Sequence, residues 1–160
     1  MKSEEKEHYV SSLDVAEFNL QQKGPVSPMK LQKLVYYAQA WSLALNNEPI
    51  FEESIEAWKN GPVVRKLLEN TRNQHYVTSI HSGNPDRIDE EFQDTITAVL
   101  IYYGQKSGDI LQHITHSEDP WIHARKKAKV NNVFSVDKKN KENINQEKMK
   151  SYYSRLNNID

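Results

Sequence analysis

Apolar residues recur along most of this chain at the spacing of one helix face. The pattern predicts a first helix that begins at Ser11 or Ser12 and stops at Gly24-Pro25. A second helix follows, because Ser27 is a typical N-cap and Pro28 suits the first helical position. The apolar positions of the two helices are Leu13, Ala16, Phe18 and Leu20, then Leu31, Leu34, Val35, Ala38, Trp41 and Leu45.

The next part of the chain changes its period. Residues 51–58 alternate between apolar and polar positions, which predicts a short strand. Asn60-Gly61-Pro62 is a predicted turn that leads into a third helix with Val63, Val64, Leu67 and Leu68 on its apolar side. Residues 76–80 have the composition of a strand, and we expect them to pair with 54–58 as a small two-stranded ribbon.

The second half of the chain returns to helical patterns. The clearest spans 92–103 and is broken by Gly104 and Ser107-Gly108. A short helix is predicted around 110–114, and Asp119-Pro120 is a typical start of another. Residues 126–148 are mostly polar and are predicted to be a mobile connection. The last predicted helix, which docks back on the domain, carries Met149, Tyr152, Tyr153 and Leu156.

These elements define a mainly α fold class, a bundle of about six or seven helices with a small two-stranded β ribbon. The 28–45 and 92–103 helices should form its centre, because their apolar faces are longest. The domain organisation we expect is a flexible N-terminus over 1–10 and one helical domain over 11–128. Residues 129–160 then form a polar, lysine-rich connection and a C-terminal helix that docks on the same domain.

Composition narrows the function classes. The net charge is -1, so bulk electrostatics give no reason to expect nucleic acid or an anionic membrane as a partner. The chain has no cysteine, which removes disulfides, thiol nucleophiles and thiolate metal sites. No apolar run approaches the roughly 20 residues of a membrane span, and the N-terminus lacks a secretion signal. We therefore expect a cytoplasmic protein with no membrane partner.

Candidate chemistry is sparse. His113, His116 and His123 invite a metal hypothesis, but no His-Glu-x-x-His motif is present and no carboxylate completes a site at a fixed helical offset. Instead of a metal site, we favour a structural role in which a histidine caps a helix or forms a hydrogen bond beside Trp121. No serine sits in a nucleophile elbow, and neither glycine fingerprint for phosphate occurs. We expect no catalytic residue, no metal and no cofactor.

Nucleic-acid binding is a second alternative. Its basis is the lysine-rich stretch 126–150, although a solvated polar tail explains the same composition. Tyr36, Tyr37 and Trp41 could stack on bases, but they lie in a helix where core packing accounts for most of them.

The most specific local feature is the run Trp58-Lys59-Asn60-Gly61-Pro62-Val63. Gly61 permits a backbone conformation that other residues avoid, and Pro62 is expected to fix the entry to the helix that follows. Trp58 at a strand end is either a lid on the core or an exposed anchor for a partner, since Trp and Tyr are favoured at binding hot spots.

Three segments together resemble one family. They are 31–41 (LQKLVYYAQAW), 55–63 (IEAWKNGPV) and 116–125 (HSEDPWIHAR), and in this order and spacing they are similar to the Panacea domain of SocA-type antitoxins, which are also described as phage-associated or GepA-like. The resemblance covers about 11–128. The matching motif positions are Leu31, Lys33, Leu34, Tyr36, Tyr37, Trp41, Ala57, Trp58, Gly61, Pro62, Val63, His116, Pro120, Trp121 and Arg125.

The resemblance implies a mainly helical domain with a small β element and a non-enzymatic role. Its members neutralise a protein toxin by binding it, or act as an adaptor that delivers the toxin to a cellular protease. The alternative function is a DNA-associated regulator of a toxin–antitoxin or phage operon; a metal protein or hydrolase is less favoured. The candidate partner-binding residues are Tyr36, Tyr37, Trp41, Trp58, Asn60, Gly61, Pro62, Val63, His116, Trp121 and Arg125, with Trp58 and Tyr37 as the main anchors.

Overall fold

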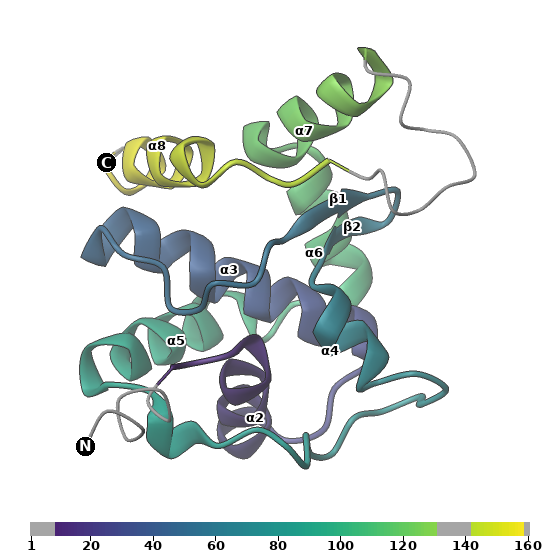
Figure 1. The fold of residues 1–160 in the computed structure, drawn as a ribbon, viewed down its shortest axis with the longest axis vertical. Coiled ribbons are helices and arrows are strands. Elements are labelled where there is room, and N and C mark those ends of the chain that lie inside the picture. Colours follow the sequence, from purple (N-terminus) through teal and green to yellow (C-terminus); the bar gives the residue numbers. More distant parts are fainter. Residues whose placement is uncertain (1–8, 131–141, 159–160) are drawn as a thin grey trace.

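Helix α3 (Pro28–Asn46) runs through the centre of the protein, and the other elements pack around it. The structure, a computed structural model, describes residues 9–130 and 142–158 (Figure 1). Ser27 caps α3 by accepting a hydrogen bond from the Lys30 N–H, with Pro28 in the first turn. Every residue from 31 to 40 is buried, so this helix has no solvated face over that stretch.

Two polar side chains on α3 tie the helix to the loops around it. The Gln32 amide donates to the Val64 carbonyl and accepts from the Val64 N–H. The Gln39 amide makes the same kind of pair with residues 50 and 51. Because each buried amide satisfies both of its groups on backbone, α3 can bury polar residues at little cost.

Helices α2 (Ser12–Lys23) and α5 (Glu90–Tyr103) cover one side of α3. Helix α2 starts with a capping box, in which Ser11 and Asp14 each bond the other's backbone. Its C-terminus is Gly24 at a φ of 95°. Helix α8 (Gln146–Asn157) covers the other side and lies along α3, as Figure 1 shows.

Strands β1 (Glu56–Trp58) and β2 (Gly61–Val63) form an antiparallel hairpin closed by Lys59 and Asn60. Residues 142–144 run along the other edge of β1, where the Ala57 N–H donates to the Glu142 carbonyl and the Ile144 N–H to the Ile55 carbonyl. The hairpin leads into the short helix α4 (Arg65–Glu69).

The remaining elements complete the shell. A 3₁₀ turn, η1 (Pro85–Arg87), precedes α5, and α6 (Gly108–His116) and α7 (Asp119–Val130) follow it. Ser107 caps α6 by accepting from the Ile110 N–H. Helices α6 and α7 both contact the hairpin, α6 through β2 and α7 through β1.

The predicted fold class is confirmed: the described residues form seven α-helices and one two-stranded sheet. The first two helices begin at the predicted caps, and the 92–103 pattern is the core of α5. None of these helices is long and apolar enough to cross a bilayer.

The predicted strand pairing is wrong. Residues 61–63 pair with 56–58, whereas Val77, in the segment predicted to be the partner, forms only an isolated bridge with Val26. The predicted third helix accordingly begins at Arg65 rather than directly after the turn. Closing a two-residue loop costs far less chain entropy than closing one of about 20 residues, which favours the local hairpin.

The predicted mobile connection began too early, because 126–130 continue α7 and Ala128 is buried. The segment from 142 to 145 is also placed, against β1. Most of the lysine-rich connection (131–141), and most of the predicted flexible N-terminus (1–8), lie outside the described residues.

Candidate functional site

The hairpin places Trp58 at the surface in a fixed orientation. Its indole N–H donates to Glu56 Oε1 at 2.7 Å, and Arg65 Nε pairs with the other oxygen of the same carboxylate at 2.8 Å. The Arg65 guanidinium also lies 5.7 Å from the centre of the Trp58 ring. Trp58 remains half-buried, so one part of a rigidly held ring faces solvent.

Helix α7 holds the hairpin from the other side. Trp121 Nε1 donates to the Trp58 carbonyl at 2.9 Å, and Arg125 donates to the Ala57 carbonyl at 2.9 Å. The Arg125 guanidinium lies 5.8 Å from the Trp121 ring centre. Trp121 and Arg125 therefore both bond the hairpin backbone. The sequence predicted that these two residues contact a partner, and the structure gives them a structural role.

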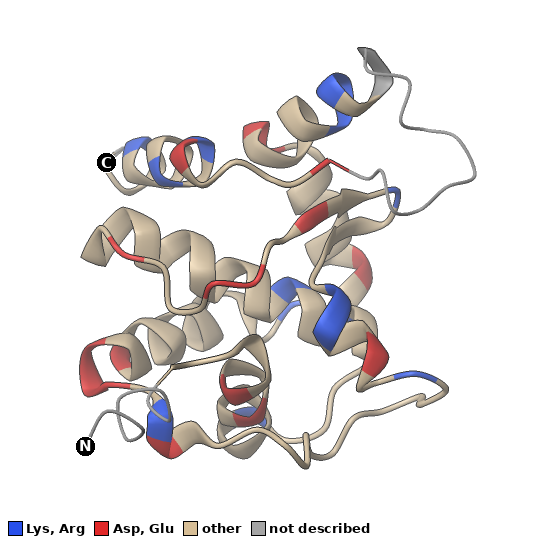
Figure 2. Cartoon of the chain, in the orientation of Figure 1, with Lys and Arg blue, Asp and Glu red and all other residues tan. Residues whose placement is uncertain are grey.

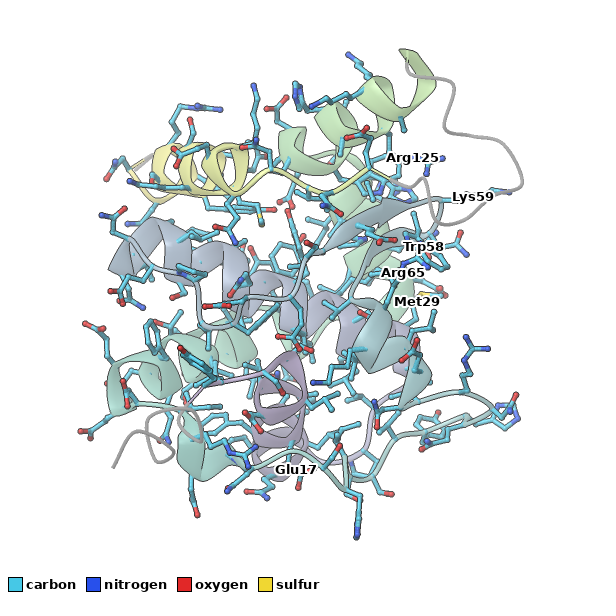
Figure 3. All side chains as sticks on the ribbon, in the orientation of Figure 1. Glu17, Met29, Trp58, Lys59, Arg65 and Arg125 are labelled. Carbon is cyan, nitrogen blue, oxygen red and sulfur yellow. The ribbon has the colours of Figure 1, made fainter. Side chains whose placement is uncertain are left out.

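A groove of about 340 Å³ opens beside Trp58, between the hairpin and the first turns of α3. We name it the hairpin groove. Figure 3 shows Met29, Trp58, Lys59 and Arg65 along the same edge of the molecule. The lining residues of the groove are Pro28, Met29, Gln32, Lys33, Trp58, Lys59, Asn60, Val63 and Leu68.

Lys33 is the unusual member of this lining, because only 2% of its surface is exposed. Its ammonium donates to the Asn60 carbonyl at 2.7 Å. Burial lowers the pKa of Lys33 from 10.5 to about 8. Among the residues that the structure describes, no carboxylate lies within ion-pair distance of this ammonium.

Gly61 lets the hairpin backbone approach Lys33. Its φ is 122°, and a Cβ built there would lie 2.7 Å from Lys33 Cε. We expect Gly61→Ala to cost about 1–2 kcal/mol of unfolding free energy through backbone strain alone. Urea unfolding measures it, with Gly24→Ala as a control that has a positive φ but open space. Equal losses in both variants would show that contact with Lys33 adds nothing at Gly61.

His116 packs flat on Trp121, with ring centres 4.0 Å apart. Its Nε2 is buried and has no partner among the described residues. Burial and the nearby Lys33 lower the pKa of His116, although a hydrogen bond with the Lys59 backbone opposes them. His116 therefore contacts α7 through the Trp121 ring and the hairpin through the Lys59 backbone.

Tyr36 and Tyr37 lie in the core, with 1% and 0% of their surface exposed. The Tyr37 hydroxyl donates to Glu118 Oε1 at 2.8 Å, and the Tyr153 hydroxyl donates to the same oxygen at 2.7 Å. The Tyr36 and Tyr153 hydroxyls are 3.1 Å apart. Burial raises the pKa of Glu118, and these hydrogen bonds oppose the rise. This network joins α3, α8 and the residue directly before α7, and it leaves neither Tyr36 nor Tyr37 at the surface.

Trp41 lies near the other end of α3. Its indole N–H donates to the Tyr103 hydroxyl at 3.0 Å. It borders a second groove of about 470 Å³ between α3, α5 and α8, which we name the α5–α8 groove. Tyr102, at 66% exposure, and Leu45, at 50%, stand on its rim.

The candidate residues thus separate into three places. Tyr36 and Tyr37 are in the core, and Trp41 is at the α5–α8 groove. The rest gather around the hairpin: Trp58, Asn60, Gly61, Pro62, Val63, His116, Trp121 and Arg125. Among these, Gly61 and Pro62 are buried, so Trp58, Asn60 and Val63 are the ones that line the hairpin groove.

Sequence reasoning missed three residues of consequence. Met29 and Leu68 line the hairpin groove, and Glu118 organises the buried tyrosines. Glu118 directly precedes Asp119-Pro120, a typical helix start where charged residues are usually solvated. No signal in the pattern therefore marks Glu118 as buried. Met29, an apolar residue in the first turn of a predicted helix, was the available signal.

The histidines of the metal hypothesis and the lysine-rich stretch of the nucleic-acid hypothesis belong to other parts of the chain than the hairpin groove. His113 and His123 are exposed, and the described residues contain no group of three His, Asp or Glu side chains that could hold a metal ion. Figure 2 shows basic residues on α7 and α8, mixed with acidic ones on both helices. The centre of the lysine-rich stretch falls outside the described part of the chain.

Comparison with known proteins identifies the family. The family described as "Antitoxin SocA-like, Panacea domain" matches residues 31–122, more than half of the chain. The chain belongs to the SocA-like antitoxin family. Its Panacea domain includes most of α3, the whole hairpin and the start of α7.

A curated relative of this Panacea-domain protein is Antitoxin SocA of Caulobacter vibrioides, 26% identical over 110 residues. The match spans 61% of this chain and 58% of the relative. No solved structure matches. The Panacea match begins at Leu31 and therefore leaves out Met29, whereas it includes Lys33, Trp58 and Glu118.

Proposed function

We propose that this Panacea-domain protein is a non-enzymatic antitoxin that neutralises a partner toxin by binding it at the hairpin groove. Membership of the antitoxin family supports the role. The observation that carries the choice of surface is Trp58: a large, rigidly held ring, partly exposed beside an apolar groove. Such rings are typical binding hot spots because they bury much area at low entropy cost.

The hairpin supports this proposal because it is fixed on every side. Glu56 and Arg65 hold the Trp58 ring, Trp121 and Arg125 hold the β1 backbone, and residues 142–144 cover its free edge. A preorganised surface loses little conformational entropy on binding. The role of Trp121, Arg125 and His116 in this proposal is to position Trp58, and the contact residues are Met29, Trp58, Lys59 and Val63.

The first test is Trp58→Ala against the protein encoded beside this gene, co-expressed and purified as a complex. We expect the variant to weaken binding by about 2 kcal/mol, or roughly thirtyfold, because the main contact ring is lost. Trp58→Phe keeps a ring and should lose less. Affinity is measured by titration calorimetry, and thermal unfolding of each variant shows that the fold is retained.

The matched control is Tyr102→Ala, which removes an exposed aromatic ring from the α5–α8 groove. We expect it to bind the toxin as the unchanged protein does. Loss of binding in Tyr102→Ala, together with normal binding in Trp58→Ala, would move the docking surface to the α5–α8 groove and refute this proposal.

Direct neutralisation differs from delivery to a protease in what happens to the toxin. If binding alone blocks the toxin, its cellular amount stays constant or rises when the antitoxin is present. An adaptor instead shortens the lifetime of the toxin. A chase experiment with and without the antitoxin measures this, and a shortened toxin lifetime would contradict direct neutralisation.

A further inference from the structure

Lys33, which lines the hairpin groove, is a buried cation with no carboxylate of the described residues beside it. Lys33 is 2% exposed and donates one hydrogen bond, to the Asn60 carbonyl. An ammonium has three donors, and burying a charge without a counter-charge is costly. The described residues place no carboxylate within ion-pair distance of it, so they do not relieve this cost.

The surroundings of Lys33 also favour an anion. The groove lies against the first turns of α3, with Pro28 and Met29 in its wall, and a helix N-terminus favours negative charge. Lys59, on the rim, adds a second cation, and this one is exposed. The apolar part of the wall consists of Pro28, Met29, Val63, Leu68 and the Trp58 ring, and Gln32 and Asn60 are its neutral polar members. The groove therefore combines an apolar wall with a single buried cation.

We propose that the hairpin groove is a carboxylate-binding site, in which Lys33 pairs with an acidic side chain or terminal carboxylate of the bound polypeptide. Apolar atoms next to that carboxylate pack on Met29 and Trp58. This inference rests on the proposed function, which makes a polypeptide the occupant. One monovalent cation matches a carboxylate, whereas a phosphate carries more charge and needs more donors.

The groove imposes a chemical selection. A neutral amide of the same shape cannot neutralise Lys33, and an amine would place a second cation beside it. Binding should therefore depend on the negative charge of the ligand as well as on its apolar part. The bound carboxylate should also raise the pKa of Lys33 toward its ordinary value.

The probe that tests this is 3-phenylpropionate, a carboxylate on a short apolar body, followed by NMR on the full chain. We expect binding with a dissociation constant of about millimolar, given so small a ligand. Chemical shifts should move at Lys33, Trp58 and Met29. The pKa of Lys33, read from its side-chain carbon resonance, should rise by about one unit or more at saturation. The neutral 3-phenylpropanamide should bind at least tenfold more weakly.

Two variants make the test specific. Lys33→Met keeps the length and apolar stem of the side chain but removes its charge, and should lose at least tenfold in affinity for 3-phenylpropionate. Lys127→Met removes an exposed lysine of α7 that does not line the groove, and should change the affinity less than threefold. Equal binding of the acid and the amide, or unchanged binding to Lys33→Met, overturns the carboxylate site. Tighter binding of 3-phenylpropyl phosphate than of the carboxylate overturns the choice of ligand.

The second test measures binding of the toxin to Lys33→Met. Lys33→Met should weaken toxin binding and make the remaining affinity less dependent on salt. Normal toxin binding by Lys33→Met, with the fold intact, overturns the assignment of the carboxylate to the bound polypeptide. This outcome differs from failure of the proposed function, in which Trp58→Ala leaves toxin binding unchanged whatever the probe does.

Discussion

The Tyr37→Ala variant should lose about 3–5 kcal/mol of unfolding free energy, the usual cost of deleting a large ring from a core. Tyr37 has no exposed surface and stacks on Tyr103 with ring centres 3.9 Å apart. The substitution also removes one of the two hydroxyls that bond Glu118 Oε1. Urea unfolding followed by circular dichroism measures the loss.

Tyr37→Phe separates the ring from the hydroxyl. It keeps the stack on Tyr103 and removes only the hydrogen bond to Glu118, so we expect a loss of about 1–3 kcal/mol. A stable Tyr37→Ala that folds normally but no longer binds the toxin would contradict this assignment. Tyr37 would then be a contact residue, as the sequence alone suggested.

Lys33→Met should make the domain more stable near pH 7. The lowered pKa of Lys33, from 10.5 to about 8, corresponds to a cost of about 3 kcal/mol for carrying this charge in the folded state. Loss of the hydrogen bond to the Asn60 carbonyl offsets part of the gain, but that carbonyl belongs to an exposed residue and can bond water. The expected net gain is about 1–3 kcal/mol.

The pH dependence of the unfolding free energy identifies the contribution of Lys33 more specifically. Between pH 8 and 10.5 the unfolded chain binds more protons at Lys33 than the folded protein does, so stability increases as the pH rises. From pH 7 to 9.5 the increase from this group is about 2 kcal/mol, and it should be absent in Lys33→Met. Above pH 10 the buried tyrosines, whose pKa values are raised by burial, act in the opposite direction.

Urea unfolding of both proteins at pH 7, 8, 9 and 9.5 therefore tests the burial of Lys33 directly. Parallel stability curves for the two proteins would show that Lys33 titrates normally, which would contradict a buried, unpaired ammonium. They would also remove the electrostatic basis of the proposed carboxylate site. A lysine retained at a cost to stability is the pattern expected of a residue kept for binding.

Much of the helical framework could be predicted because its signals are local. Ser11, Ser27 and Ser107 cap helices through their own neighbours, and apolar periodicity fixed the length of α3 and α5. The hairpin was mispredicted because Asn60-Gly61-Pro62 is equally typical of a turn into a helix, and Pro62 argues against a strand unless that strand is an edge. That β2 is an edge strand is decided by the segment 142–144 on the far side of β1.

The candidate site was harder to predict, because the exposure of its side chains depends on packing between elements that are distant in sequence. The pattern placed Trp58 in the most informative motif, and the structure leaves that ring partly exposed. It also proposed Tyr37 as an anchor, and packing against Tyr103 and Glu118 places this ring in the core. Aromatic residues on a helix carry no local mark that separates a core ring from a surface one.

The sequence by itself determined most helices, because caps and apolar periodicity act over a few residues. It also contained the family-typical segments and, without cysteine, excluded thiol chemistry. Only the tertiary structure decided which polar groups lose water. Lys33 and Glu118 look like ordinary solvated charges in the chain, and each is buried by elements distant in sequence: Lys33 by the Gly61 backbone, Glu118 by α3 and α8. Desolvation depends on what packs against a group, and that is fixed only when the chain has folded.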